Sequence, residues 1–229
     1  MSLYVIIMGV QGAGKGTQAQ FIQREFGIPQ ISTGDLFRAM KTRTDDFAVQ
    51  IQNLMNSGAL IDNETTEKMV AERLLADDAQ KGVIFDGFPR TIHQAEWLDA
   101  HLAQKGSGIK RVLLLELDSY TAFKRAYGRV TDAHTGVAYN IYSNAGDIQW
   151  QFVEHPEKAF PPRLEASLNG QKLARRADDD ASYVIKRIDT FLEQTMPLIN
   201  YYSQKGLVQR IDATLSIETV SQQIKSLLG

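Results

Sequence analysis

The residues with the clearest chemistry form a glycine-rich turn near the start of the chain, Gly9-Val10-Gln11-Gly12-Ala13-Gly14-Lys15-Gly16-Thr17. An apolar run at 3–8 precedes the turn, and residues 18–22 follow it with apolar side chains at helical spacing. Glycines let successive backbone N–H groups surround an anion, the helix start adds a positive dipole end, and Lys15 adds a mobile charge. The turn therefore predicts a nucleotide polyphosphate site, formed by Gly12, Ala13, Gly14, Lys15, Gly16 and Thr17.

The elements that position this turn alternate between strand and helix. Apolar runs predict strands at 28–31, 82–86, 111–117 and 207–211, in addition to 3–8. Helical spacing predicts helices from Ser32 to Met40 and over 46–56, 63–78, 91–104, 179–202 and 217–228, with Asp62 as an N-cap. Because these strands are apolar without alternation, we expect an α/β fold in which helices cover both faces of a parallel sheet.

The pattern changes between residues 128 and 179. Helical periodicity is lost there, and turn signals such as Asn169-Gly170 alternate with β-like runs at 137–142 and 148–153. About 50 residues are too many for a structureless loop. The region is predicted to be an inserted subdomain with a small antiparallel sheet.

The composition limits the class of protein. The chain has 229 residues, of which 43% are hydrophobic and 23% charged, which are ordinary globular values. A net charge of −2 argues against a general nucleic-acid or membrane surface, and the absence of cysteine excludes disulfides and thiolate metal sites. No apolar run reaches the roughly 20 residues of a membrane span, and the first one lacks a basic leader. We expect a cytoplasmic protein with no membrane or nucleic-acid partner.

Several motifs in order along the chain resemble those of the adenylate kinases, the nucleoside monophosphate kinases with a long lid. They are the phosphate loop, 31–35, Asp86-Gly87-Phe88-Pro89-Arg90-Thr91, Arg125 with Gly128-Arg129, 176–179, and Lys186-Arg187. The resemblance implies a five-stranded parallel core (1–31, 62–127 and 180–229), a helical monophosphate-binding flap (32–61) and a β lid (128–179). It implies reversible transfer of the ATP γ-phosphoryl group to AMP, giving two ADP, by a monomer.

The chemistry of phosphoryl transfer explains why the motifs contain so many positively charged residues. An acceptor phosphate is already a nucleophile, so catalysis needs positioning and neutralisation of charge, for which arginine is well suited. By resemblance, Lys15, Arg90, Arg129, Arg176 and Arg187 are catalytic, and Arg125 and Arg129 join the loop in binding ATP. The residues implied for AMP are Thr33, Gly34, Arg38, Ala59, Ile61, Gly87, Arg90, Gln94, Arg176 and Arg187. Taken alone, each arginine is more often a solvated surface charge, and it is their combination at matching motif positions that favours the functional interpretation.

Magnesium is the expected cofactor. Gly16 stands where most phosphate loops carry the Ser or Thr that holds the ion, so we expect few direct protein ligands. Asp86, at the end of its strand, and Asp35 are the candidates for holding magnesium through water. The alternative for Asp86 is a structural role as the cap of the next turn.

Two positions indicate which base the acceptor nucleotide carries. Thr33 resembles the adenylate kinase threonine that contacts the AMP base, and Gln94 stands where the family reads the adenine edge with a paired donor and acceptor. Pyrimidine kinases usually carry asparagine after the arginine, where this chain has Thr91. AMP is therefore favoured, and a UMP/CMP kinase is the alternative.

The lid departs from many of its relatives because it has no cysteine to bind zinc. Asp132, Thr135 and Asn169 are candidates for a polar network in place of the metal. The segment 140–159, with Trp150 and Phe152, makes the lid longer, and it either takes part in closure or only packs the lid.

Two other classes remain as alternatives. A GTPase-like switch would need an Asn-Lys-x-Asp motif, which this chain lacks. A catalytically dead nucleotide-binding module would be expected to have lost one of the main arginines, and none is missing.

Overall fold

The structure is a computed structural model that describes residues 2–56, 61–155, 161–176 and 179–229, without the side chains of Arg38 and residues 54–56. The chain divides into two compact units. The first unit contains Met1–Met8, Gly14–Leu115 and Gln194–Gly229, and the second contains Gly9–Ala13 and Glu116–Glu193. None of the helices in the described ranges is both long and apolar enough to cross a membrane.

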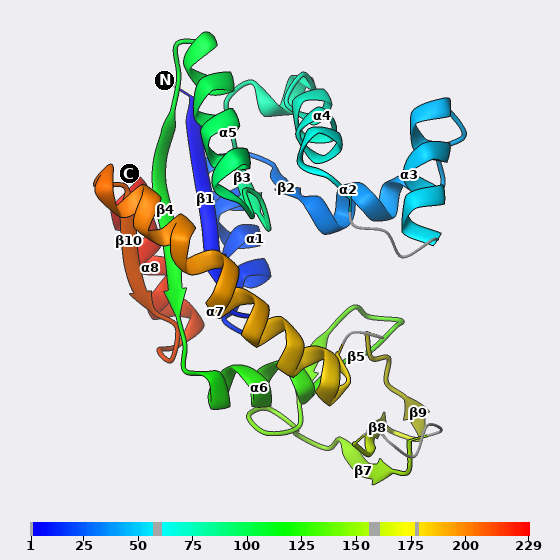
Figure 1. The fold of residues 1–229 in the computed structure, drawn as a ribbon. Helices are drawn as coiled ribbons and strands as arrows, with labels where there is room; N and C mark the ends of the chain where they lie inside the picture. The colour runs from blue at the N-terminus through cyan, green and yellow to red at the C-terminus, as the bar shows by residue number, and fades with distance from the viewer. Residues whose placement is uncertain (1, 57–60, 156–160, 177–178) are drawn as a thin grey trace. The chain divides into compact units, whose positions relative to one another are not determined.

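A five-stranded parallel sheet forms the centre of the first unit (Figure 1). Its strand order is β10-β4-β1-β3-β2. The strands are β1 (Leu3–Gly9), β2 (Gln30–Ser32), β3 (Gly82–Asp86), β4 (Ile109–Glu116) and β10 (Val208–Asp212). Val5, Val83 and Val112 are completely buried, because helices cover both faces of the sheet. The predicted parallel sheet is confirmed.

The register of the sheet brings chemistry-bearing residues to one edge. Asp86, the last residue of β3, is the register partner of Ile7 on β1 and of Ser32 on β2. The chain leaves β1 through the glycine-rich turn, and β1 lies between β3 and β4, where the strand order reverses. Open α/β sheets bind their ligands outside the carboxyl ends of the strands at such a switch point.

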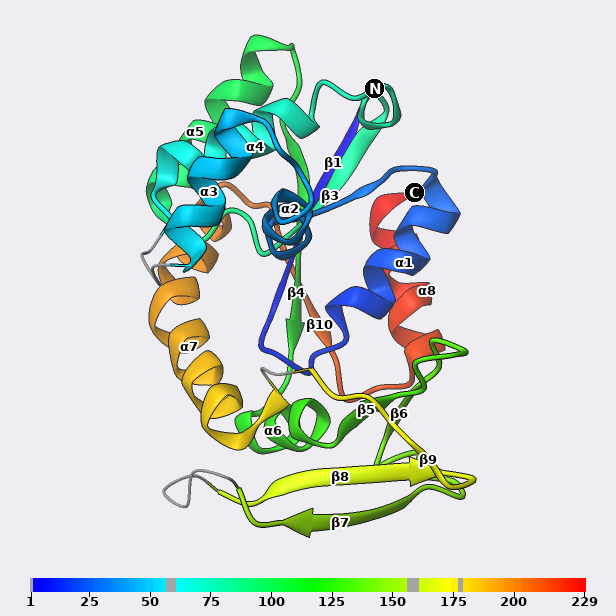
Figure 2. The ribbon, with the colours of Figure 1, turned by 90° about the vertical axis from the view of Figure 1, so that its right-hand side faces the viewer.

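Helices flank this sheet on two sides. Figure 2 shows α1 (Lys15–Phe26) and α8 (Ile217–Leu228) on one side and α5 (Ile92–Gln104) on the other. Helix α4 (Asn63–Arg73) packs against α5. The Asp62 side chain caps α4 by accepting the Thr65 N–H at 2.7 Å, which confirms the predicted N-cap.

One helix end differs from the prediction. Helix α4 ends at Arg73, and Asp77–Ala79 form a separate 3₁₀ turn, so a single helix over 63–78 was wrong. The Arg73 guanidinium donates two hydrogen bonds to the Asp78 carboxylate, at 2.7 and 2.6 Å, and holds the chain in this turn. The small helices α2 (Thr33–Met40) and α3 (Asp46–Asn56) share an apolar cluster with α4 through Met40, Ala48, Ile51 and Met69.

The second unit contains two small antiparallel sheets. Strand β5 (Arg129–Thr131) pairs with β6 (Ala138–Asn140), and β8 (Arg163–Leu168) pairs with β7 (Gln149–Val153) and β9 (Gln171–Lys172). Helix α6 (Ser119–Tyr127) precedes them, and α7 (Ala181–Gln204) begins in this unit and ends in the first. The predicted small antiparallel sheet is confirmed, although β8 and β9 were not anticipated.

The core of the second unit is apolar and contains no metal-binding cysteine. Its buried side chains come from α6, the strands and the start of α7: Tyr127, Val130, Ile141, Ile148, Leu164, Ala166, Leu173 and Ala181. The Phe152 ring lies 6.2 Å from that of Tyr127, and Trp150 meets Phe152 edge-on at 5.5 Å. Both β7 rings remain about half exposed, at 43% for Trp150 and 50% for Phe152. These contacts of Trp150 and Phe152 favour a packing role for the hairpin, the part of segment 140–159 that contains β7.

A largely buried arginine contacts three segments of this unit: α6, β8 and residues 179–180. The Arg175 side chain is 12% exposed and donates to the backbone carbonyls of Tyr127 and Asp179, both at 2.7 Å. It also donates to the Leu164 carbonyl at 3.4 Å and to the Asp180 carboxylate at 3.2 Å. Its guanidinium lies over the Tyr127 ring. Arg175 thus connects α6 and β8 to the start of α7.

Candidate functional site

The phosphate loop has the backbone that its glycines predict. Gly12 and Gly14 adopt left-handed conformations, with φ of 91° and 90°, and the Ala13 N–H bonds to the Val10 carbonyl at 3.1 Å. A Cβ atom on Gly12 would stand 2.6 Å from the Ala122 carbonyl oxygen. Lys15 is the first residue of α1. The loop therefore presents backbone N–H groups, a helix N-terminus and an ammonium group in one stretch of chain.

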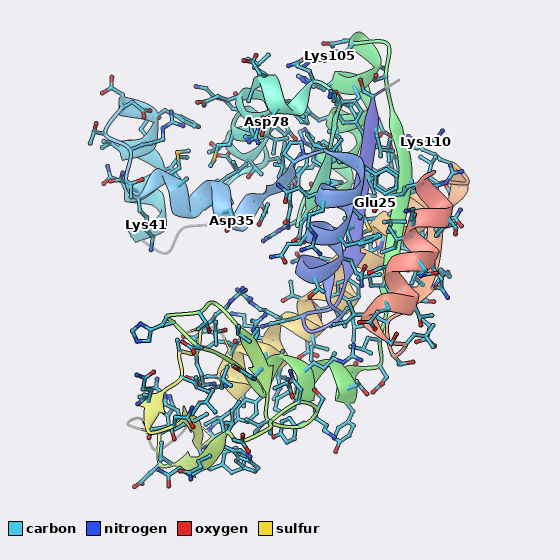
Figure 3. All side chains as sticks on the ribbon, turned by 180° about the vertical axis from the view of Figure 1, so that it is seen from behind. Glu25, Asp35, Lys41, Asp78, Lys105 and Lys110 are labelled. Carbon is cyan, nitrogen blue, oxygen red and sulfur yellow. The ribbon has the colours of Figure 1, made fainter. Side chains whose placement is uncertain are left out.

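An acidic residue stands at the neighbouring strand end. The Asp86 carboxylate accepts a hydrogen bond from Gln30 Nε2 at 2.9 Å. Burial raises the pKa of Asp86, while the Lys15 ammonium and the Gln30 hydrogen bond act in the opposite direction. Asp35 lies on α2 with an exposed side chain (Figure 3) and adds to the rise in the pKa of Asp86. A half-buried carboxylate at the end of a strand suits a hydrated magnesium ion.

A polar cluster in the first unit joins three residues assigned to AMP. The Gly87 carbonyl accepts hydrogen bonds from Thr33 Oγ1 and Arg90 Nε, both at 2.9 Å. Arg90 Nη2 reaches Thr33 Oγ1 at 3.4 Å. Gly87 has φ of 73°, and a Cβ there would come within 3.2 Å of Thr33 Oγ1, so the turn requires glycine. These contacts fix the position of Arg90 Nε, and therefore the orientation of the guanidinium group.

Gln94 is buried beside this cluster, with 5% of its surface exposed. Its Oε1 accepts the Arg90 backbone N–H at 2.8 Å, and its Nε2 donates to Asn63 Oδ1 at 2.9 Å. The backbone N–H of Gln94 bonds to Thr91 Oγ1, the N-cap of α5. The amide is therefore held in a single orientation.

In the second unit, Arg129 is held by an acidic residue. Asp179 is completely buried, and its carboxylate accepts Arg129 Nη2 at 2.6 Å and Nε at 3.0 Å. Gln11 of the phosphate loop donates its Nε2 to the same carboxylate at 3.2 Å. This pair uses two of the five guanidinium N–H groups, and the hydrogen bonds among the described residues use no other.

The remaining candidates are spread over both units. Arg125 lies on α6, and its carbonyl accepts Asn140 Nδ2 at 2.9 Å. Arg176 and Arg187 of the second unit are exposed. Gly34 lies in the first turn of α2, and Ile61 packs against the apolar cluster of α2, α3 and α4. Ala59 and the Arg38 side chain lie outside the described residues.

The polar network expected in the lid is only local. The Asp132 carboxylate accepts the N–H groups of His134 at 2.8 Å and of Thr135 at 3.2 Å. Asn169 stands in the β8–β9 turn with φ of 51°. Among the residues that the structure describes, no group of three or more acidic or histidine side chains could hold a metal ion.

Sequence reasoning gave no role to several residues of this site. Asp179 belongs to a motif that was recognised, but burial and pairing with Arg129 only became apparent in three dimensions. For Gln11, the only signal in the sequence was its position in the phosphate loop. Asn63 had none beyond following the Asp62 cap, because its partner Gln94 lies on another helix.

A parallel sheet of this order, with a glycine-rich loop after β1 and an acidic residue at the end of β3, defines a P-loop nucleotide-binding fold. The comparisons with known proteins narrow the class. Residues 7–207 match the family model "Adenylate kinase". The adenylate kinase of Thermoanaerobacter sp. (strain X514) is 39% identical over 227 residues, which are 98% of this chain and 97% of the relative.

Two further relatives agree. The adenylate kinase of Fusobacterium nucleatum is 37% identical over 229 residues and 100% of both chains, and that of Carboxydothermus hydrogenoformans is 39% identical over 226 residues and 98% of both. The chain belongs to the adenylate kinase family, and its reaction is ATP + AMP = 2 ADP. The family and the activity predicted from the motifs are confirmed. Adenylate kinases act on the small molecules ATP, AMP and ADP and use Mg²⁺ with ATP.

Proposed function

We propose that this chain divides the transfer between a core, a flap and a lid, with the boundaries expected from the sequence. Residues 12–17 bind the ATP phosphates, with Lys15 neutralising charge on the transferred group. Arg125 stacks on the ATP adenine, and Arg129 binds ATP. The observation that carries the proposal is the position of Lys15 at the start of α1, where its ammonium group acts on Asp86 at the end of β3 and partly offsets the rise that burial causes in the pKa of that carboxyl.

AMP binds to the polar cluster of the first unit in this proposal. Arg90 and Arg38 hold its phosphate, and Thr33 and Gln94 contact its base, with Gly34, Ala59, Ile61 and Gly87 lining the site. The contacts of Arg90 Nε with the Gly87 carbonyl and of its Nη2 with Thr33 Oγ1 support its role, because they place the guanidinium beside the other residues proposed for AMP. Arg129, Arg176 and Arg187 then neutralise the transferring phosphoryl group, and the latter two also contact AMP.

Asp86, with Asp35 as a weaker second, would hold magnesium through water. When bound, the ion neutralises charge on the ATP phosphates. The protein's own part is to keep the Asp86 carboxylate oriented, which the Gln30 hydrogen bond does. The Lys15 ammonium favours the ionised carboxylate against the effect of burial. By its resemblance to the family, we further propose that the enzyme works as a monomer in the cytoplasm.

A coupled assay with AMP, CMP, UMP and GMP as acceptors tests the acceptor. We expect kcat/KM for AMP to exceed that for either pyrimidine nucleotide by at least about 100-fold, because buried polar groups left unpaired by the wrong base are costly. Comparable rates with CMP or UMP would contradict the proposal.

Substitutions test the charged residues separately. Lys15→Met and Arg90→Ala should each lower turnover by about 100-fold or more, because each removes charge stabilisation that grows in the transition state. Thermal unfolding of each variant provides the control for folding. A variant that retains more than about a third of wild-type turnover would remove that residue from the mechanism.

A further inference from the structure

The orientation of the Gln94 amide is set from two sides, by Arg90 and by Asn63. The Arg90 backbone N–H can only donate, so it must meet the oxygen of the amide, which lies at 2.8 Å. On the other side, Asn63 Oδ1 accepts the Gln94 Nε2 group at 2.9 Å. A reversed amide would oppose donor to donor at Arg90 and acceptor to acceptor at Asn63.

Asn63 is itself oriented by the start of helix α5. Thr91 Oγ1 accepts the backbone N–H of Gln94 at 3.2 Å, and its hydroxyl donates to Asn63 Oδ1 at 3.2 Å. Asn63 is the first residue of α4, directly after its Asp62 cap. The helix starts of α4 and α5 are thereby joined in a closed set of hydrogen bonds around the Gln94 side chain.

The two bonds leave the amide with one further N–H and one further lone pair, in a fixed order. The adenine edge carries an acceptor at N1 and a donor at N6, which match this N–H and this lone pair. A 6-oxopurine carries the reverse, a donor at N1 and an acceptor at O6. Only a reversed amide would suit the 6-oxopurine.

We propose that Asn63 is a specificity-positioning residue, which fixes the Gln94 amide so that the site takes a 6-aminopurine monophosphate and rejects a 6-oxopurine monophosphate. The inference rests on the proposed function, in which Gln94 contacts the AMP base. Asn63 acts through Gln94 and does not itself touch the substrate. Its contribution is a second anchor beside the Arg90 N–H.

Two variants separate the acceptor atom from the rest of the side chain. Asn63→Leu keeps the approximate size but removes the acceptor, so reversal of the amide is opposed by Arg90 alone. Asn63→Asp keeps an oxygen acceptor toward Gln94 and suits the first turn of a helix. We expect Asn63→Leu to lower the ratio of kcat/KM for AMP to that for IMP by about 10-fold, which is the effect of about one hydrogen bond. Asn63→Asp should keep the ratio within about threefold of wild type.

The assay uses the full chain with ATP as the donor and AMP or IMP as the acceptor. For Asn63→Leu, the KM for AMP should rise while the KM for ATP and the turnover at saturating AMP stay within about threefold. Calorimetric titration of AMP and IMP gives the same ratio without turnover. It serves as the second measurement if Asn63→Leu has a lowered Tm. If Asn63 had only a structural role, the substitution would lower kcat/KM for AMP and for IMP by the same factor.

The outcomes are distinct. An unchanged AMP-to-IMP ratio in Asn63→Leu, with a wild-type enzyme that prefers AMP, overturns the role of Asn63 and leaves the proposed function intact. A wild-type enzyme without preference for AMP overturns both. If Gln94→Leu keeps the wild-type kcat/KM for AMP, Gln94 does not contact the base and the inference fails with it.

Discussion

Replacing Arg175 by methionine tests whether a largely buried arginine takes the place of a metal in holding the second unit together. The change keeps much of the apolar stem but removes donors to three backbone carbonyls and one carboxylate. Hydrogen bonds to charged groups contribute about 1.5–3 kcal/mol each, but contacts that share one guanidinium are not additive. Because Asp180 keeps its contact with Arg163, most of the cost comes from the three backbone carbonyls that lose their donor, at about 1–3 kcal/mol each, and we expect a total loss of about 3–5 kcal/mol.

The two tryptophans make this loss measurable in the unit concerned. Trp97 lies in the first unit and Trp150 in the second. In a Trp97→Phe background, urea unfolding followed by Trp150 fluorescence reports the second unit. With m of about 2 kcal/mol per molar urea, a loss of about 4 kcal/mol lowers the midpoint by about 2 M.

Arg163→Met is the matched control, because Arg163 bonds the same Asp180 carboxylate at 3.2 Å but is 46% exposed. Its loss should be at most about 1 kcal/mol, as is usual for exposed ion pairs. A loss below about 1 kcal/mol for Arg175→Met, or equal losses for both variants, would refute the reasoning from burial.

Three more predictions concern other parts of the molecule. Asp86→Asn should raise the free energy of unfolding at pH 7, because burial raises the pKa of Asp86 and disfavours its charge in the folded state. The gain should shrink as the pH falls through the raised folded-state pKa of Asp86 toward the ordinary value of 3.8, because the wild-type carboxyl then becomes neutral too, and urea titrations at pH 7 and at low pH check this. Gln11→Leu and Asp179→Asn should be non-additive in unfolding free energy by at least about 0.5 kcal/mol, since one hydrogen bond joins them, and a double-mutant cycle measures this. Phe152→Ser should lower the unfolding free energy by about 1 kcal/mol, because the ring is half exposed but packs on Tyr127. Turnover at saturating ATP and AMP, measured in a coupled assay, should stay within about twofold of wild type. Slowed turnover would instead give the hairpin a part in lid closure.

Much of the first unit could be predicted because its signals are local. The Asp62 cap, the Asp46–Asn56 helix and the closing helix Ile217–Leu228 were each anticipated at the residues where they occur. Capping residues and apolar spacing act over a few positions, so a single sequence contains them. The glycine-rich turn belongs to the same kind, because its left-handed glycines are a local requirement.

The parts that could not be predicted depend on contacts between distant segments. Arg175 and Arg176 are neighbours of the same type, yet Arg175 is largely buried and joins α6 to β8 while Arg176 is exposed. Strand β8 alternates buried Leu164 and Ala166 with partly exposed residues, and alanine gives little strand signal. The bond between Asn63 and Gln94 links residues 31 positions apart. Pairings of this kind appear only when the helices are packed.

The missing side chain of Gly12 has a consequence for how the loop and helix α6 move. With a left-handed backbone and the Ala122 carbonyl 2.6 Å from where a Cβ would stand, the loop rests directly on the helix backbone, and Arg125 Cβ lies 3.1 Å away. No side chain lies between them that could change rotamer and absorb a shift. The part of the loop around Gly12 and the backbone of α6 at Arg125 should therefore be displaced together. In the proposed enzyme, Gly12 binds the ATP phosphates and Arg125 stacks on the adenine. This contact would therefore keep the distance between Gly12 and Arg125 constant, and with it the length of nucleoside that the site accepts.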